Sequence, residues 1–100
     1  MENVTYKNST FKMSTHAIEQ CNFRFKGVNV QDAIGRGKMV DSQNSNKYGQ
    51  LVVNKMRTMS EKYSTSTRLI INTHFNTAFA VDINTKIVIT ALYLDGTWSL

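Results

Sequence analysis

The 100-residue sequence has one cysteine, Cys21, and no long hydrophobic run. A single cysteine cannot form an intramolecular disulfide, and it supplies too few ligands for a cysteine-based zinc or iron-sulfur site. The longest aliphatic stretch, residues 87–94, contains Thr90 and is far shorter than the roughly 20 residues that cross a bilayer. We therefore expect a protein without a metal, a cofactor or a membrane span.

Signals for export and for nucleotide cofactors are also missing. The chain opens with polar residues, among them Glu2, Asn3 and Thr5, where a secretory signal has a basic segment and then an apolar one. The sequence has no phosphate-binding loop, no dinucleotide-binding glycine motif and no paired-carboxylate motif. Together with the single cysteine, these absences favour a cytoplasmic location.

Positive charge is concentrated in the first two thirds of the chain. Twelve Lys and Arg against seven Asp and Glu give a net charge of +5. Residues 69–100 hold Lys86 against Asp82 and Asp95, a net charge of −1, which leaves +6 for residues 1–68. Such a field attracts the phosphates of nucleic acids, and it attracts anionic protein partners as well.

Length and composition predict one globular domain. Chains of this size bury roughly 60 to 70% of their unfolded surface and need neither disulfides nor metals to fold. Hydrophobic residues make up 41% of the chain and charged residues 19%, and the apolar residues are clustered, so we expect a real core. Within the single domain of residues 1–100, we expect a polar lead-in over residues 1–12, a core over residues 13–94 and a tail over residues 95–100.

Two helices are predicted near the N-terminus. Ser14 is a suitable N-cap for the first helix. Apolar residues then recur at helical spacing and form one stripe: Ala17, Ile18, Cys21 and Phe25. A polar stripe runs beside it: His16, Gln20 and Arg24. Gly27 predicts a left-handed helix end, and Asn29 predicts the cap of a second, short helix that stops at residues 35–37.

The rest of the chain predicts an antiparallel sheet. Residues 38–40 and 48–53 are predicted strands, and residues 10–13 a weaker edge strand. Residues 54–67 are predicted to be a long basic connection, with a helix through Val53, Met56 and Met59 as the open alternative. Residues 68–75, 78–83 and 86–94 alternate between the turn signals Asn76-Thr77 and Asn84-Thr85, which predicts a meander. The expected fold class is α+β, with two N-terminal helices packed on one face of a four- to five-stranded antiparallel sheet.

The order of these motifs resembles a known family. A Ser-x-His-Ala sequence starting at Ser14 is followed by Arg24, by Gly27-Val28, by a short helix and a polar turn, and by a meander ending in residues 88–90. Over residues 13–93 this succession is similar to the small BrnT- and RelE-related domains of the barnase, EndoU, colicin and RelE-like ribonuclease superfamily. The resemblance implies a toxin-type or phage-encoded protein that cuts RNA without a metal ion. The family pattern has an arginine where this chain has Gln20, and it implies functional roles for His16, Arg24 and Thr90.

Metal-free cleavage of RNA needs a base near the 2′-hydroxyl, positive charge on the phosphorane and a proton for the leaving oxygen. His16 is the candidate base, because the positive end of a helix dipole favours the neutral imidazole. Arg24 would stabilise the phosphorane, with Thr90 or Tyr93 orienting the phosphate, and His74 is a weaker candidate. The plainer alternatives stay open: a solvent-exposed histidine at a helix start, a surface ion pair for the arginine, and ordinary strand packing for the others.

Several further side chains are candidates for contacts with RNA. Phe23 lies close to His16 on the helical wheel and suits stacking on an unpaired base, with burial against the N-terminal segment as the alternative. The other candidates are polar or basic: Lys12, Gln20, Lys26, Arg36, Lys38, Lys47, Arg57 and Arg68.

These candidates lead to two hypotheses. In the first, the protein is a metal-independent toxin-type endoribonuclease that acts on RNA, ribosome-associated message included, with an antitoxin or host protein as its partner. In the second, it is a non-catalytic phage or mobile-element inhibitor or adaptor that binds a host protein or nucleic acid. The first hypothesis requires that His16, Arg24 and Thr90 converge within one cleft.

Overall fold

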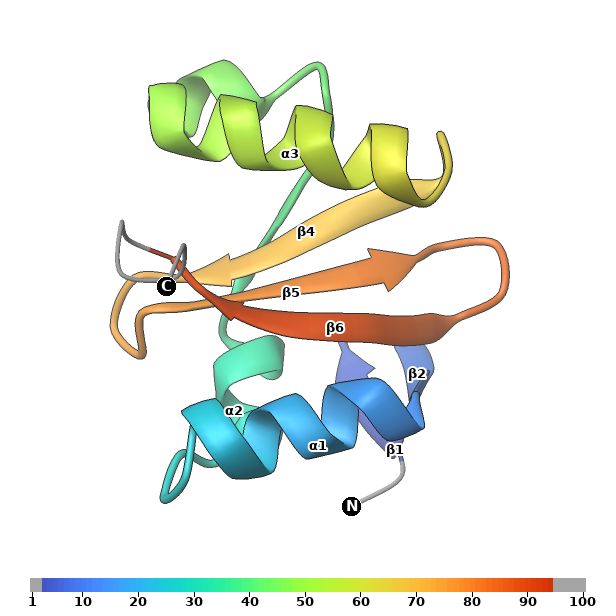
Figure 1. Ribbon diagram of the computed structural model, residues 1–100, viewed down its shortest axis with the longest axis vertical. Coiled ribbons are helices and arrows are strands. Elements are labelled where there is room, and N and C mark those ends of the chain that lie inside the picture. Colours follow the sequence, from blue (N-terminus) through green and yellow to red (C-terminus); the bar gives the residue numbers. More distant parts are fainter. Residues whose placement is uncertain (1–2, 95–100) are drawn as a thin grey trace.

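A six-stranded sheet lies between two layers of helices (Figure 1). The computed structural model of the protein describes residues 3–94. The strands are β1 (Asn3–Tyr6), β2 (Ser9–Met13), β3 (Lys38–Val40), β4 (Thr67–Asn72), β5 (Thr77–Asp82) and β6 (Ile87–Tyr93). Helices α1 (Thr15–Arg24) and α2 (Val30–Gly35) cover one face, and α3 (Gln50–Lys62) covers the other after a short 3-10 helix, η1 (Ser45–Tyr48).

The strand order is β1-β2-β6-β5-β4-β3, and one of the pairs is parallel. β2 pairs with β6 in parallel through Lys12 opposite Ile87 and Met13 opposite Val88, whereas the other neighbours are antiparallel. The α+β class is confirmed, but the expectation of four to five antiparallel strands is wrong. An alternating pattern shows which residues of a strand face a core, and it does not show which strand lies alongside.

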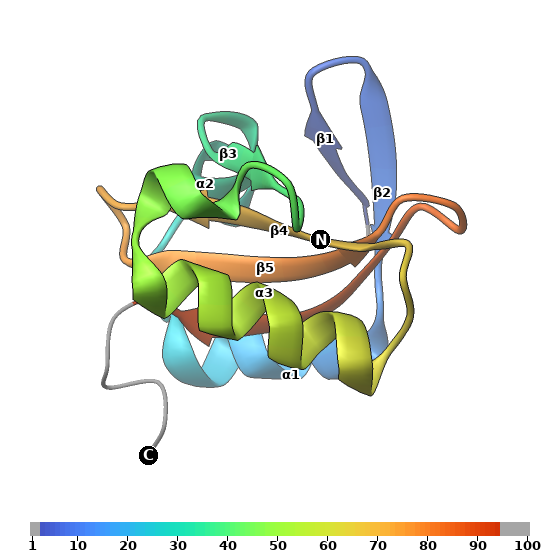
Figure 2. The ribbon, with the colours of Figure 1, turned by 90° about the horizontal axis from the view of Figure 1, so that it is seen from above.

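The N-terminal residues build part of the sheet. The segment predicted as a polar lead-in forms the β1–β2 hairpin, which buries Val4, Tyr6 and Phe11 and stands across the direction of the β4–β6 strands (Figure 2). The Gln31 side-chain amide accepts from the Thr5 N–H and donates to the Thr5 carbonyl, both at 2.8 Å. The Tyr6 hydroxyl accepts from the Met39 backbone amide at 3.0 Å. Since β1 and β3 are the two edges of the sheet, these side chains cover backbone groups that would otherwise be open to further strands.

Helix α1 follows its predicted pattern. The Ser14 hydroxyl accepts from the Ala17 amide at 3.0 Å and donates to the Ile89 carbonyl at 3.0 Å, so the helix cap also ties α1 to β6. Ala17, Cys21 and Phe25 are buried, as the apolar stripe predicts. Gly27 has a φ of 88°, in the left-handed region that its position after the helix requires.

Helix α2 also follows its predicted pattern. The Asn29 side chain accepts from the Asp32 amide at 3.0 Å, which confirms the predicted cap. The helix residues Ala33 and Ile34 are fully buried in the core between α2 and the sheet, and Val30 packs against the same core. The helix ends at Gly35, at the predicted stop.

The main error in the predicted elements concerns residues 48–67. The predicted strand over residues 48–53 and the basic connection after it are replaced by η1 and α3. Val52, Met56 and Met59 lie on one side of α3 and pack against the second face of the sheet. Because helices cover both faces, β4 and β5 are buried on both sides, which explains their nearly continuous apolar sequence.

The meander of β4, β5 and β6 is confirmed, with antiparallel pairs throughout. Asn76 and Lys86 take positive φ values of 55° and 59° in its two turns. In the second turn, Asp82 accepts from the amides of Asn84 and Thr85 at 2.8 and 3.0 Å. The bonds from Thr85 and Asn84 hold the pKa of the Asp82 carboxyl below its usual value, because they stabilise the ionised form.

Candidate functional site

His16 and Arg24 lie at opposite ends of α1. The His16 side chain is exposed in the first turn, and Arg24 is the last residue of the helix. Eight residues at about 1.5 Å each separate the two along the helix axis by about 12 Å. An imidazole and a guanidinium this far apart do not hold the same phosphate group.

Arg24 and Tyr93 do come together, but they fasten α1 to the sheet. The Arg24 guanidinium donates to the Ala91 carbonyl at 3.0 Å, and the Tyr93 hydroxyl donates to the Arg24 carbonyl at 2.9 Å. The Tyr93 ring also meets the Phe25 ring edge-on, with centroids 5.0 Å apart. These contacts give both residues a place in the fold, and they occupy the groups that the sequence suggested for a phosphate.

Thr90 lies on the other face of the sheet. It pairs with Ala80, and residues directly opposite in an antiparallel pair share a face. Ala80 belongs to the core beneath α3, whereas Ala17 and Cys21 of α1 belong to the core on the opposite side. The expected cleft shared by His16, Arg24 and Thr90 therefore does not form.

Most of the predicted RNA contacts are spread over the molecule. On α1, Gln20 is half-buried, and its buried Oε1 has no hydrogen-bond partner within residues 3–94. Phe23 on the same helix is 83% exposed, and Lys26 just after the helix is exposed. Lys12 is exposed on β2, Lys47 in η1 and Arg57 on α3, while Arg68 of β4 bonds the carbonyls of Thr65 and Thr67. These side chains do not define a common surface.

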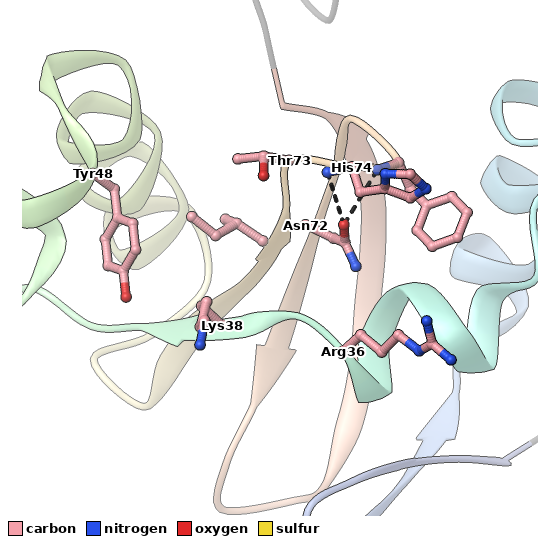
Figure 3. A pocket seen from close by; sticks show the side chains of 8 residues that line it. Arg36, Lys38, Tyr48, Asn72, Thr73 and His74 are labelled. Atoms are coloured by element: carbon pink, nitrogen blue, oxygen red, sulfur yellow. Dashed lines mark hydrogen bonds between the residues drawn. The ribbon is translucent and has the colours of Figure 1, made fainter.

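Arg36 and Lys38 are different, because they line one pocket of about 530 Å³ at the end of β4. The residues around it are Arg36, Lys38, Tyr48, Ile71, Asn72, Thr73, His74 and Phe75. In the view of Figure 3, Tyr48 and Lys38 lie on one side of the pocket and Arg36 and His74 on the other, with Asn72 between them.

Gly37 explains why the two cations point outward. A Cβ atom on Gly37 would lie 2.7 Å from Ile70 Cγ2 and 2.9 Å from the Ile71 carbonyl oxygen, so the backbone there packs directly on β4. The residues on either side, Arg36 and Lys38, are exposed. The Arg-Gly-Lys sequence thus presses its centre against the sheet and presents its two charges to the pocket.

Asn72 holds the turn that carries His74. Its side chain is 7% exposed, and its Nδ2 donates to the Ala33 carbonyl of α2 at 3.0 Å. Its Oδ1 accepts from the amides of His74 and Phe75 at 3.0 and 3.2 Å (Figure 3). One buried amide therefore fixes the turn after β4 relative to the helix whose end carries Arg36.

The pocket suits an anion with an apolar part. Within residues 3–94, its lining has two basic side chains, an imidazole, a phenol and a threonine hydroxyl, and no Asp or Glu. Imidazole is the side chain that most readily exchanges protons near neutral pH. Within residues 3–94, no group of three or more His, Cys, Asp or Glu side chains could hold a metal ion. The arrangement can therefore bind a phosphate and move a proton beside it.

Sequence reasoning selected Arg36 and Lys38 by charge alone, and it did not place them beside His74. Tyr48 was missed because it was assigned to a strand, although it ends η1. The available signal was local: Arg36 and Lys38 flank a glycine, and Asn72 stands two residues before His74 at the end of a strand. Both patterns indicate side chains held outward by a tightly packed backbone.

No helix within residues 3–94 is long and apolar enough to cross a membrane. Comparisons with protein-family models, with curated proteins and with solved structures found no match to this chain. The function is therefore argued from the pocket and its chemistry.

Proposed function

We propose that this protein binds RNA and cleaves it without a metal ion, at the pocket lined by Arg36, Lys38 and His74. The observation that carries the proposal is that two basic side chains and an imidazole line a single pocket, and that none of its lining residues within residues 3–94 is an Asp or a Glu. The sequence resemblance to toxin-type ribonucleases predicts the same activity, with an antitoxin as a partner, but it assigns that activity to His16, Arg24 and Thr90, which do not share a cleft. We place the proposed chemistry at the end of β4 and not on α1, because Arg36, Lys38 and His74 line one pocket there.

The lining residues divide the reaction between them. His74 takes the proton of the 2′-hydroxyl as its oxygen attacks phosphorus, and the bond from phosphorus to the 5′-oxygen breaks, which leaves a 2′,3′-cyclic phosphate. Arg36 and Lys38 stabilise the added negative charge of the phosphorane. Tyr48 lines the opposite side of the pocket from His74 (Figure 3) and is the proposed donor of the proton to the departing 5′-oxygen, because attacking and leaving oxygens lie on opposite sides of phosphorus. The tyrosinate then regains a proton from water, and the imidazolium of His74 releases its proton to water, so that both groups return to their starting forms.

The test is cleavage of RNA, ribosome-bound message included, by the purified protein in EDTA. His74→Ala should lower the cleavage rate by about 10²- to 10⁴-fold, the usual contribution of a general base. His16→Ala is the matched control, since it removes the other histidine from an exposed position outside the pocket, and it should leave the rate unchanged. Absence of cleavage with every RNA, or equal losses for the two variants, would contradict the proposal.

A second candidate function, the non-catalytic inhibitor or adaptor, has one observation in its favour. Phe23 is 83% exposed on α1, and large aromatic side chains are enriched where proteins bind one another. A stable complex with a host protein that is lost on Phe23→Ser and kept on His74→Ala would establish this function in place of cleavage. Cleavage in EDTA that survives Phe23→Ser would exclude it as the main activity.

A further inference from the structure

The walls of the pocket carry information about the ligand beyond its negative charge. Ile71, Phe75 and the Tyr48 ring contribute apolar surface to the lining, whereas Arg36 and Lys38 are exposed at the same pocket. An inorganic anion gains nothing from apolar walls. A nucleotide has a flat base and a phosphate on the same molecule, and it satisfies both kinds of lining.

The two aromatic residues of the lining are anchored in different cores. Tyr48 packs against the core beneath α3, and Phe75 packs against the core beneath α1 and α2. The lining of the pocket therefore draws on both faces of the sheet at the end of β4, and each of its aromatic side chains packs partly on a core. Rigid aromatic surfaces of this kind bind unpaired bases by stacking, with little dependence on which base it is.

The size of the pocket limits the form of the nucleic acid. A volume of about 530 Å³ is within the range of about 300 to 1,000 Å³ typical of small-ligand sites. Bases in a duplex have both faces stacked, and removing one costs a few kcal/mol. We propose that the pocket takes one unpaired nucleotide, with the base on Tyr48 and the phosphate on Arg36 and Lys38, so that the substrate is single-stranded RNA. This inference rests on the proposed RNA function and specifies its substrate.

The test measures binding by isothermal titration calorimetry with four probes: inorganic phosphate, adenosine 3′-monophosphate, a single-stranded oligoribonucleotide with 2′-deoxy sugars at its cleavable positions, and the duplex of the same sequence. The mononucleotide should bind at least about 10-fold tighter than phosphate, the effect expected for one stacked base. The single strand should bind tighter than the duplex by a similar factor. Equal affinities in either comparison would overturn the inference.

Variants separate the two parts of the proposed contact. Tyr48→Ala should remove the advantage of the mononucleotide over phosphate, whereas Arg36→Met should weaken both probes. Tyr63→Ala is the matched control, because Tyr63 is an exposed tyrosine after α3 that does not line the pocket, and it should change neither affinity. Thermal unfolding followed by circular dichroism checks that each variant is folded. Tighter binding of a phosphotyrosine peptide than of the mononucleotide would overturn the inference in favour of a protein ligand.

The outcomes also separate this inference from the proposed activity. Binding of the mononucleotide without cleavage of any RNA would remove the ribonuclease and leave the nucleotide pocket. Cleavage of duplex as fast as single-stranded RNA would keep the ribonuclease and overturn the inference. Both comparisons use the full chain and the same preparation.

Discussion

Helices α1 and α2 lie on the same face of the sheet, and each has an arginine at or next to its last residue, but they are fastened in different ways. Helix α1 docks through side chains, because the Arg24 guanidinium and the Tyr93 hydroxyl bridge it to β6. Helix α2 buries Ala33 and Ile34 in the same core, and the segment that follows it docks through backbone, because Gly37 packs directly on β4. The side chain of Arg36 is consequently left at the surface of a pocket.

The comparison shows that one residue type at similar positions can be bonded to the sheet in one place and exposed at a pocket in another. Within residues 3–94, no hydrogen-bond acceptor holds the Arg36 guanidinium, whereas Arg24 is bonded to the sheet. Charged donors are costly to bury and are kept in a fold when they have a fixed partner. Substitutions at each point of contact test this difference.

The largest effect on stability is expected at Gly37, where the backbone after α2 packs on β4. Gly37→Ala should lower the free energy of unfolding by about 1 to 3 kcal/mol, because the new methyl group would overlap backbone atoms that cannot move aside. Gly35→Ala is the matched control, since its Cβ would meet no atom closer than Gln31 Nε2 at 3.2 Å, with the nearest backbone atom, the Thr5 carbonyl oxygen, at 3.6 Å, and it should change stability by less than about 1 kcal/mol. Urea unfolding measures both, and equal losses would contradict the docking by backbone.

The two arginines should respond in opposite ways. Arg24→Met should lower the free energy of unfolding by about 1 to 2 kcal/mol, because it removes a half-buried, charge-assisted hydrogen bond, and it should leave RNA affinity unchanged. Arg36→Met should keep the unfolding free energy within about 0.5 kcal/mol and weaken RNA binding. Urea unfolding and fluorescence anisotropy with labelled RNA report the two quantities. If Arg36→Met destabilises the protein as much as Arg24→Met does, the assigned roles are wrong.

A smaller effect is expected from the hydroxyl groups of two tyrosines. Tyr93→Phe removes the bond to the Arg24 carbonyl and should cost about 1 kcal/mol of stability. Tyr48→Phe should cost less than about 0.5 kcal/mol and slow RNA cleavage. The paired measurements are thermal unfolding and cleavage in EDTA. If Tyr93→Phe keeps the stability of the protein but impairs cleavage, the cleavage site lies near Arg24 and Tyr93 and not at the pocket.

The smallest effect is expected from a measurement on the unaltered chain, the chemical reactivity of Cys21, which reports how well α1 stays packed on the sheet. Burial raises the pKa of the Cys21 thiol to about 11 by desolvation of the thiolate. At pH 8 the folded protein should therefore react with iodoacetamide far more slowly than the protein unfolded in urea, and the folded rate should rise as the pH approaches 11. Equal rates in the folded and unfolded states at pH 8 would show that α1 opens readily.

The parts of the fold that were predicted correctly depend on neighbouring residues. Ser14 caps α1 through an amide three residues on, and the apolar stripe from Ala17 to Phe25 belongs to one helix. Helix α3 could not be predicted in this way, because its apolar stripe is short and Val52 and Val53 favour a strand. It is held in place by burial against β4 and β5, which lie later in the chain.

The candidate site could be predicted only in part, because its residues come from segments that are distant in the chain. Arg36 and Lys38 could be chosen by charge, but Tyr48 and His74 join them from other elements. The role of these four residues in RNA binding stays a prediction. Thr90 shows the converse, since a strand residue chosen by alternation faces a helix that the pattern did not predict.

The sequence by itself determined the local features of this protein: the caps at Ser14 and Asn29, the left-handed Gly27, the meander and the excess of positive charge. Each depends on contacts within a few residues or on composition. Only the tertiary structure decided that β2 lies beside β6, that α3 covers the second face, and that Arg36 and His74 line one pocket. These outcomes depend on apolar surfaces that are distant in the chain and are buried together only when the whole chain folds.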